Sequence, residues 1–210
     1  GEHIFRPAGM QDSGYFATDQ LPPRTAQSYI QNSDGTWRSN IYAVPIVGGP
    51  DGGAYTTAAD MARFWQALTT HQLLNAETTA HLLSPKTATQ SPPPYDHYGR
   101  GVWIEAGAAG IRKYFVEGSD PGVAFRSAVY PLHGLVLTIL ANTGRTLWPL
   151  FGEIEALVAP LDGLPALAGA NMPTNGPLPA FAATQFSGLP SPLTEPELRE
   201  FLGRYPQWAL

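Results

Sequence analysis

The spacing of apolar positions predicts two helices in the first half of the chain. Four apolar residues recur at i, i+3, i+4 and i+7, so that one helix face is apolar and packs inward: Met61, Phe64, Trp65 and Leu68. Thr57 and Asp60 form a capping-box-like start for this helix, with Asp in place of the usual Glu. A second, short helix is predicted over "NAETTAHLL", with Asn75 as its cap, and Pro85 ends the helical pattern.

From Tyr98 to Asn142 the pattern changes to that of β-strands. Four segments rich in β-branched and aromatic residues are separated by turn residues: "YGRGVWIEA", "IRKYFVE", "VAFRSAVY" and "LVLTILAN". Because the residues from Leu135 to Ala141 are apolar at nearly every position, we expect a central strand that is covered on both faces.

A third helix is predicted after the strands, over "TLWPLFGEIEALVAPL". Its apolar stripe consists of Leu150, Ile154, Leu157 and Val158. An antiparallel sheet with helices before and after it predicts an α+β fold, in which helices flank the sheet.

The two ends of the chain carry less regular patterns. Residues 1–55 are rich in Gly, Pro, Asp, Asn and Ser, and we expect long ordered loops there, with Glu2 to Phe5 as the end of a helix. Residues 160–193 are dense in Pro, Gly and Ala and predict a linker or an extended tail. "TEPELREFLGRY" begins with a capping box and predicts a last helix within residues 194–210, which leaves residues 1–159 as the folded domain.

Composition narrows the class of protein. Of 210 residues, 43% are hydrophobic and 14% are charged, which is typical of a soluble globular domain. The net charge of -5 provides no basic face for nucleic acid, and basic clusters that would attract an anionic membrane are absent from the sequence. The longest apolar run, Gly134 to Ala141, is too short to span a bilayer. The absence of cysteine excludes disulfides, thiolate metal sites and a cysteine nucleophile.

No metal or cofactor is expected. The five histidines are scattered and have neither HxxxH nor HExxH spacing. "GGPDGGAY" has no preceding strand and no Gly-Lys-Ser/Thr, which favours a turn over a phosphate loop. Lys86 in "SPKTA" follows a proline in a loop, and this favours a solvated lysine over a catalytic one.

Three segments resemble a known family, in the order in which that family carries them. They are "EHIFRPAGMQDSGYF", "GGAYTTAADMARFWQAL" and "YFVEGSDPGVAFRSAVYPLHGLVLTILANTG", and they span roughly residues 1 to 158. The family is that of the serine β-lactamase-like proteins, which includes class C β-lactamases, D-alanyl-D-alanine carboxypeptidases and related esterases. The resemblance implies the C-terminal portion of a β-lactamase/penicillin-binding-protein transpeptidase-like fold.

The family's mechanism, as the resemblance implies it, is acylation of a serine. The serine belongs to a Ser-x-x-Lys motif and is assisted by Tyr-x-Asn and by a third motif, Lys-Thr-Gly or His-x-Gly, on an exposed strand. Neither of the first two motifs occurs in this chain. In the family both precede the segment that begins here within the first ten residues. We therefore expect a missing N-terminal portion to carry the nucleophile, and the chain to be inactive alone. The alternative is a non-catalytic binding or structural module that reuses the fold.

The third motif aligns on the segment from Val116 to Gly122. The resemblance implies that Gly118 allows close backbone approach, that Ser119 offers its N–H to the oxyanion, and that Gly122 opens the next turn. Val116 occupies the position of the family's basic residue. A valine neither donates a proton nor binds a carboxylate, so the resemblance favours an esterase or amidase over an efficient β-lactamase.

Three polar residues complete the candidate site. Glu117 follows Val116 and is expected on the opposite strand face, unless a bulge re-aims it into the cleft as a catalytic carboxylate. Asp120 fits a turn residue better than an acid catalyst. Asn142 matches the family's asparagine at the end of the last strand, where it either borders the substrate or caps the strand.

The expected partners follow from the same resemblance. One is a small-molecule ester, amide or β-lactam substrate. The other is either the missing N-terminal fragment or a second copy of the chain, because an uncovered strand edge pairs readily with another strand. The family also suggests an extracytoplasmic location.

Overall fold

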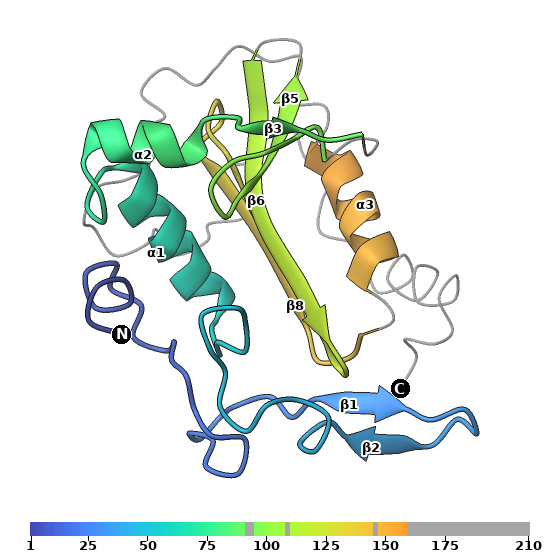
Figure 1. The fold of residues 1–210 in the computed structure, drawn as a ribbon. Helices are drawn as coiled ribbons and strands as arrows, with labels where there is room; N and C mark the ends of the chain where they lie inside the picture. The colour runs from blue at the N-terminus through green and yellow to red at the C-terminus, as the bar shows by residue number, and fades with distance from the viewer. Residues whose placement is uncertain (91–94, 108–109, 145–146, 159–210) are drawn as a thin grey trace, which may run out of the picture. The chain divides into compact units, whose positions relative to one another are not determined.

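The described residues fold around one antiparallel sheet in which every strand lies beside its neighbour in sequence. The structure is a computed structural model, and it describes residues 1–90, 95–107, 110–144 and 147–158. The sheet order is β3-β4-β5-β6-β7-β8. The strands are β3 (Thr87–Ala88), β4 (His97–Tyr98), β5 (Trp103–Gly107), β6 (Gly110–Asp120), β7 (Val123–Tyr130) and β8 (Leu135–Ala141). Helices α1 (Ala58–Thr69) and α2 (Ala76–Leu83) lie on one side of the sheet and α3 (Leu147–Val158) on the other, which confirms the α+β prediction (Figure 1).

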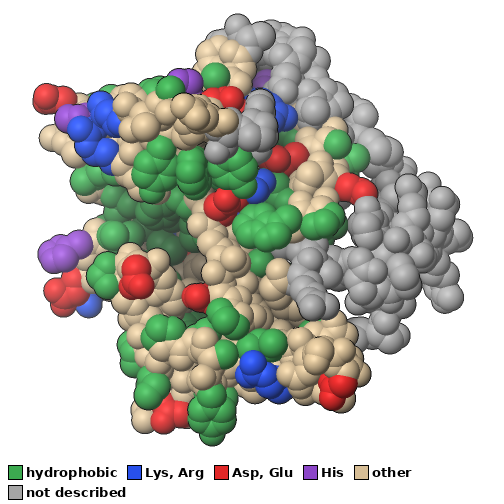
Figure 2. Space-filling model, turned by 45° about the vertical axis from the view of Figure 1, so that its right-hand side comes forward, with side chains coloured by type: hydrophobic (Ala, Val, Ile, Leu, Met, Phe, Trp, Pro, Cys, Tyr) green, Lys and Arg blue, Asp and Glu red, His purple; other side chains and the backbone are tan. Residues whose placement is uncertain are grey.

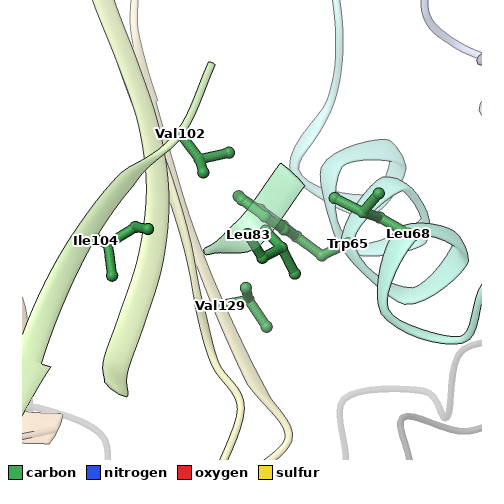
Figure 3. Close-up of a cluster of buried hydrophobic side chains, with 6 residues drawn as sticks. All are labelled: Trp65, Leu68, Leu83, Val102, Ile104 and Val129. Carbon is green, nitrogen blue, oxygen red and sulfur yellow. The ribbon is translucent and has the colours of Figure 1, made fainter. Parts of the chain in front are cut away.

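Helix α1 begins as its sequence predicts. The Thr57 hydroxyl accepts a hydrogen bond from the Asp60 N–H at 3.1 Å, so the cap satisfies one of the unpaired donors of the first turn. The apolar face then buries Trp65 completely against the sheet. Figure 3 shows the resulting core cluster, which consists of Trp65, Leu68, Leu83, Val102, Ile104 and Val129. The Trp65 indole N–H donates to the buried Ser127 hydroxyl at 2.9 Å, so its one polar group is satisfied inside this layer.

A second core lies on the α3 side of the sheet. Phe115, Ala128, Tyr130 and Phe151 are its fully buried members. The predicted stripe of α3 is wrong at Leu157, which is 61% exposed, whereas Phe151 is buried. The helix therefore turns the face of Phe151 and Glu155 toward the sheet, because charged and aromatic partners for both residues lie there.

Two strand predictions are corrected. Strand β8 lies at an edge of the sheet and not at its centre, because among the described residues β7 is its only ladder partner. The segment "YGRGVWIEA" divides into β4 and β5, since Gly101 adopts a φ of 83° and allows a turn between the two strands.

The N-terminal third contains more regular structure than its composition indicates. Residues 2–9 form hydrogen-bonded turns and not the end of a helix, although Gly9 has the positive φ of 68° that ends many helices. Strands β1 (Tyr29–Gln31) and β2 (Trp37–Ser39) form a separate hairpin. The predicted boundary at residue 159, the linker over 160–193 and the helix within 194–210 lie outside the described residues. Among the described helices, none is long and apolar enough to cross a membrane.

Candidate active site

The residues that the sequence singles out lie on the C-terminal half of β6 and on the turn after it. From Tyr114 to Asp120 this strand pairs with β7, and Asp120 faces Val123 across the turn formed by Pro121 and Gly122. The pairing with β5 ends earlier, at Trp103 and Phe115. Within the described part of the chain, residues 116–120 therefore have a ladder partner on one side only, and we call this segment the one-sided segment.

Val116 points to the side of the sheet that α1 covers. Its half-buried side chain packs against two core clusters, one around Trp65 and one that contains Met10, Met61 and Ala67. Phe125, which faces Gly118 in the register, packs against the second cluster. The surface next to Val116 is therefore apolar. Figure 2 shows one face of the molecule, on which hydrophobic side chains line a hollow.

Gly118, Ser119 and Asp120 are exposed at the end of the strand. A Cβ added to Gly118 would meet no heavy atom within 4 Å, and the residue does not have a positive φ. The fold itself therefore does not require glycine at this position. Gly122 differs, because it has a φ of 82° and an added Cβ would come within 3.0 Å of the Tyr29 carbonyl oxygen.

Glu117 points to the opposite side of the sheet, toward α3, as strand alternation predicts. Its Oε2 accepts a hydrogen bond from the Arg126 Nε at 2.6 Å, and its Oε1 accepts one from the Tyr95 hydroxyl at 2.9 Å. An Arg126 Nη2 also donates to the Tyr95 oxygen at 3.0 Å. Burial raises the pKa of Tyr95, and its hydrogen bond to Glu117 adds to the increase.

The ion pair of Glu117 and Arg126 is one end of a charged row between the sheet and α3. This row was not predicted from the sequence. Cations and anions alternate along the row in the order Arg112, Glu105, Lys113, Glu155, Arg126, Glu117. Lys113 is fully buried, with its Nζ 3.0 Å from a Glu105 oxygen and in contact with Glu155. The Tyr130 hydroxyl donates to Glu155 at 2.7 Å. Burial is the main cause that raises the pKa of Tyr130 well above its usual range, and this hydrogen bond raises it further.

A register shift in β6 makes the row possible. Glu105 pairs with Lys113 and Ala106 with Ile111, so Arg112 is the extra residue of a bulge. A bulge interrupts alternation, and the neighbours Arg112 and Lys113 both reach Glu105 on the α3 side. The hint in the sequence was the common parity of Lys113, Phe115 and Glu117, which places charges and an aromatic ring on one strand face.

The β1–β2 hairpin borders the one-sided segment. The buried Asn40 donates from its Nδ2 to the Pro121 carbonyl oxygen at 3.1 Å. Asn142 donates from its side-chain Nδ2 to the Gln27 carbonyl oxygen at 2.9 Å, and the backbone carbonyl oxygen of Asn142 accepts a hydrogen bond from the Tyr29 N–H at 3.0 Å. Asn142 and the turn after Asp120 are thus both attached to the same hairpin. Among the described residues, no cluster of His, Asp or Glu could hold a metal ion.

Comparisons with known proteins agree with the fold. The family model described as Beta-lactamase matches residues 1–157. The chain is 26% identical over 153 residues to the putative penicillin-binding protein PbpX of Bacillus subtilis (strain 168), covering 73% of this chain and 33% of that protein.

Two solved structures are also similar. A penicillin-binding protein from Bacillus halodurans has a TM-score of 0.70 and 46% identity, over 74% of this chain and 48% of that one. The octameric penicillin-binding protein homologue from Pyrococcus abyssi has a TM-score of 0.66 and 19% identity, over 76% of this chain and 36% of that one. The chain thus spans half or less of the length of each of these relatives.

Proposed function

Because the chain belongs to the Beta-lactamase family over residues 1–157, we propose that it is the C-terminal part of a serine hydrolase of that family. The reaction is the cleavage of an ester or amide bond through an acyl-serine intermediate. In this proposal a preceding portion of a longer protein carries the serine and its lysine. The present chain supplies the strand on which the acyl group is held, and alone it is inactive.

Gly118 is the observation that carries the proposal. It lies in the one-sided segment with open space around its Cα and without a positive φ. A glycine that weakens a strand and satisfies no local constraint marks a place where a ligand or another backbone comes close. In the proposed site the acyl group approaches at Gly118, and the adjacent Ser119 N–H stabilises the oxyanion.

The apolar surroundings of Val116 favour an uncharged group next to the scissile bond. Val116 packs among hydrophobic side chains, and Glu117 is bonded to Arg126 on the other side of the sheet. A carboxylate beside Val116 would lose its hydration without gaining a cation from that residue. An ester or amide therefore fits better than a β-lactam, although the names of the three similar proteins refer to penicillin binding.

Val116 also favours a second candidate function, that of a non-catalytic module. Its position is the one at which the third motif of the family has a basic residue. A protein that uses the fold only for binding or structure would keep the strand and turn and lose that basic side chain.

The first test compares the two candidates in the longer protein. The residues encoded upstream of Gly1 are read, and the hydrolase proposal requires a Ser-x-x-Lys motif there. The intact protein is then treated with a fluorescent penicillin and a fluorophosphonate. Labelling by the fluorophosphonate is expected, since it reports an activated serine. No upstream Ser-x-x-Lys, or no labelling by either reagent, would support the non-catalytic module.

A second test uses Gly118→Ala with Gly52→Ala as its matched control. An added Cβ meets nothing within 4 Å at either position, so both variants should fold as the parent does. We expect Gly118→Ala to slow serine labelling of the intact protein at least about tenfold, through obstruction of acyl-group approach. Gly52→Ala should label at the parent rate. Equal rates in both variants would remove Gly118 from the site.

A further inference from the structure

The one-sided segment needs a fixed backbone, yet the sheet fixes it on one side only. Pairing with β5 ends at Phe115, and residues 116–120 pair only with β7 among the described residues. Segments with fewer hydrogen-bonded neighbours open more readily. Donors to an oxyanion contribute most when they are held in place before the reaction. Side-chain contacts must therefore supply part of the missing restraint.

Val116 packs against the core on the α1 side, and Glu117 is the residue of the segment that provides polar contacts, on the α3 side. Both carboxylate oxygens are occupied, one by the Arg126 Nε at 2.6 Å and the other by the Tyr95 hydroxyl at 2.9 Å. Arg126 also donates to Tyr95 at 3.0 Å, so the three side chains form a closed ring of hydrogen bonds. We call these three residues the β6 clamp. Charge-assisted hydrogen bonds of this kind are shorter and stronger than neutral ones.

The other two members of the clamp are anchored away from the segment. The Arg126 guanidinium lies 4.1 Å from the centre of the Phe151 ring and 5.1 Å from that of Trp148, both on α3. Its side chain is only 8% exposed, and its Nη1 lies 3.8 Å from a Glu155 oxygen. Tyr95 packs edge-on against Trp103, with ring centres 5.1 Å apart. The clamp thus ties the segment to α3 and to Trp103 on β5.

We propose that the β6 clamp fixes the backbone of residues 118–120 and that Glu117 is a positioning residue of the candidate site. Glu117 lies on the side of the sheet opposite to Val116 and is bonded at both oxygens, so it orders the strand without exchanging protons with a substrate. The role of the ordered segment in holding the oxyanion rests on the proposed function. The ordering of the segment itself can be measured without any enzyme activity.

Hydrogen exchange of the full chain tests the clamp. Glu117→Ala is compared with Arg112→Ala, which removes an ion pair at the other end of the same row. The two pairs are alike in burial, with side chains 8% and 15% exposed for Arg126 and Glu117 and 15% and 12% for Arg112 and Glu105. We expect amides of residues 118–120 to exchange about tenfold faster in Glu117→Ala, relative to those of Val129 and Tyr130, and unchanged in Arg112→Ala.

Two exchange results would overturn the proposal: unchanged exchange at residues 118–120 in Glu117→Ala, or an equal increase in both variants, which would indicate general loosening. Glu117→Gln keeps an oxygen for Arg126 and a polar group for Tyr95, so its exchange should return to near the parent rate.

Fluorophosphonate labelling of the intact protein should also survive Glu117→Gln, and its loss with normal exchange would identify a catalytic carboxylate instead. If the unmodified intact protein is not labelled at all, the proposed function fails while the exchange comparison still decides the clamp.

Discussion

Gly48 and Gly52 lie in one loop and differ in what a side chain would meet. A Cβ at Gly48 would lie 2.5 Å from the Gly53 carbonyl oxygen, a backbone atom that cannot rotate away, whereas a Cβ at Gly52 would meet nothing within 4 Å. We expect Gly48→Ala to lower the free energy of unfolding by about 1 to 3 kcal/mol, the usual cost of overpacking. Gly52→Ala should leave it unchanged or slightly higher. Urea denaturation of both variants checks this, and equal stabilities would contradict it.

Tyr130 gives the stability of the chain a dependence on alkaline pH. Burial and its hydrogen bond to Glu155 raise its pKa above the ordinary value of 10.0, so the folded state keeps a proton that the unfolded state releases. This contribution is complete below the ordinary value and is lost as the pH rises above it. Urea midpoints measured from about pH 8 to about pH 11 should therefore fall more steeply in the parent than in Tyr130→Phe. Equal slopes would show that Tyr130 is not responsible.

At the scale of elements, Asp60 attaches the N-terminal segment to α1. The residue is fully buried, and its Oδ2 accepts from the Asp12 N–H at 2.8 Å and the Ser13 hydroxyl at 2.6 Å. Its Oδ1 accepts from Arg63 at 2.7 Å. Asp60→Ala leaves the Asp12 N–H without this acceptor and removes one hydrogen bond each from Ser13 and Arg63, and we expect it to lower the free energy of unfolding by about 2 to 4 kcal/mol in urea denaturation.

Asp12→Ala is the control for that variant. Among the described residues the Asp12 side chain forms one long contact, with Arg24 at 3.9 Å, and both side chains are largely exposed. Exposed pairs of this kind contribute little to stability. Its unfolding curve should overlie that of the parent, and a loss as large as that of Asp60→Ala would show that the segment is sensitive to any substitution.

The elements that could be predicted from the sequence are those whose determinants are local. Thr57 and Asn75 cap α1 and α2 through groups three residues away, and β7 has the predicted bounds because turn residues flank it. The position of β8 was predicted wrongly, because an apolar strand looks the same at the centre and at the edge of a sheet. That distinction depends on neighbours, and the pattern within the strand contains no information about them.

The charged row could not be predicted, for a related reason. Lys113 and Glu155 are 42 residues apart, and the bulge at Arg112 alters the alternation on which a strand prediction relies. The strand predicted over "IRKYFVE" is longer in the structure, because β6 continues beyond Glu117 through Gly118 and Ser119 to Asp120, which was predicted as a turn residue. The functional roles of these residues stay a prediction.

At the scale of the whole molecule, we expect the outer edge of β8 to be a site for association. The strand is almost entirely apolar and pairs with β7 alone among the described residues. An unprotected apolar edge adds another strand readily. In the proposed longer protein the preceding portion covers this edge. We expect the present chain by itself to form dimers or larger species as its concentration rises, in sedimentation velocity experiments.

Two exposed leucines allow a matched test of that prediction. Leu140 lies on β8 and is 43% exposed, whereas Leu157 lies on α3 and is 61% exposed. Leu140→Lys places a charge at the strand edge and should shift the chain toward monomer. Leu157→Lys should associate as the parent does. A monomeric parent at high concentration, or equal dissociation of both variants, would rule out association through β8.

The attachment of the β1–β2 hairpin constrains the order in which the molecule folds. Its hydrogen bonds join Asn40 to Pro121 and Gln27 to Asn142, across 81 and 115 residues of chain. Contacts between such distant positions form slowly, because the chain entropy lost on closing a long loop comes before the contacts can stabilise the fold. The hairpin leaves the ribosome early but cannot dock until β7 and β8 have been synthesised and paired. The wall beside the candidate site therefore forms only after Asn142 has been made, and a molecule interrupted before β7 would lack both that wall and Val129 of the α1 core.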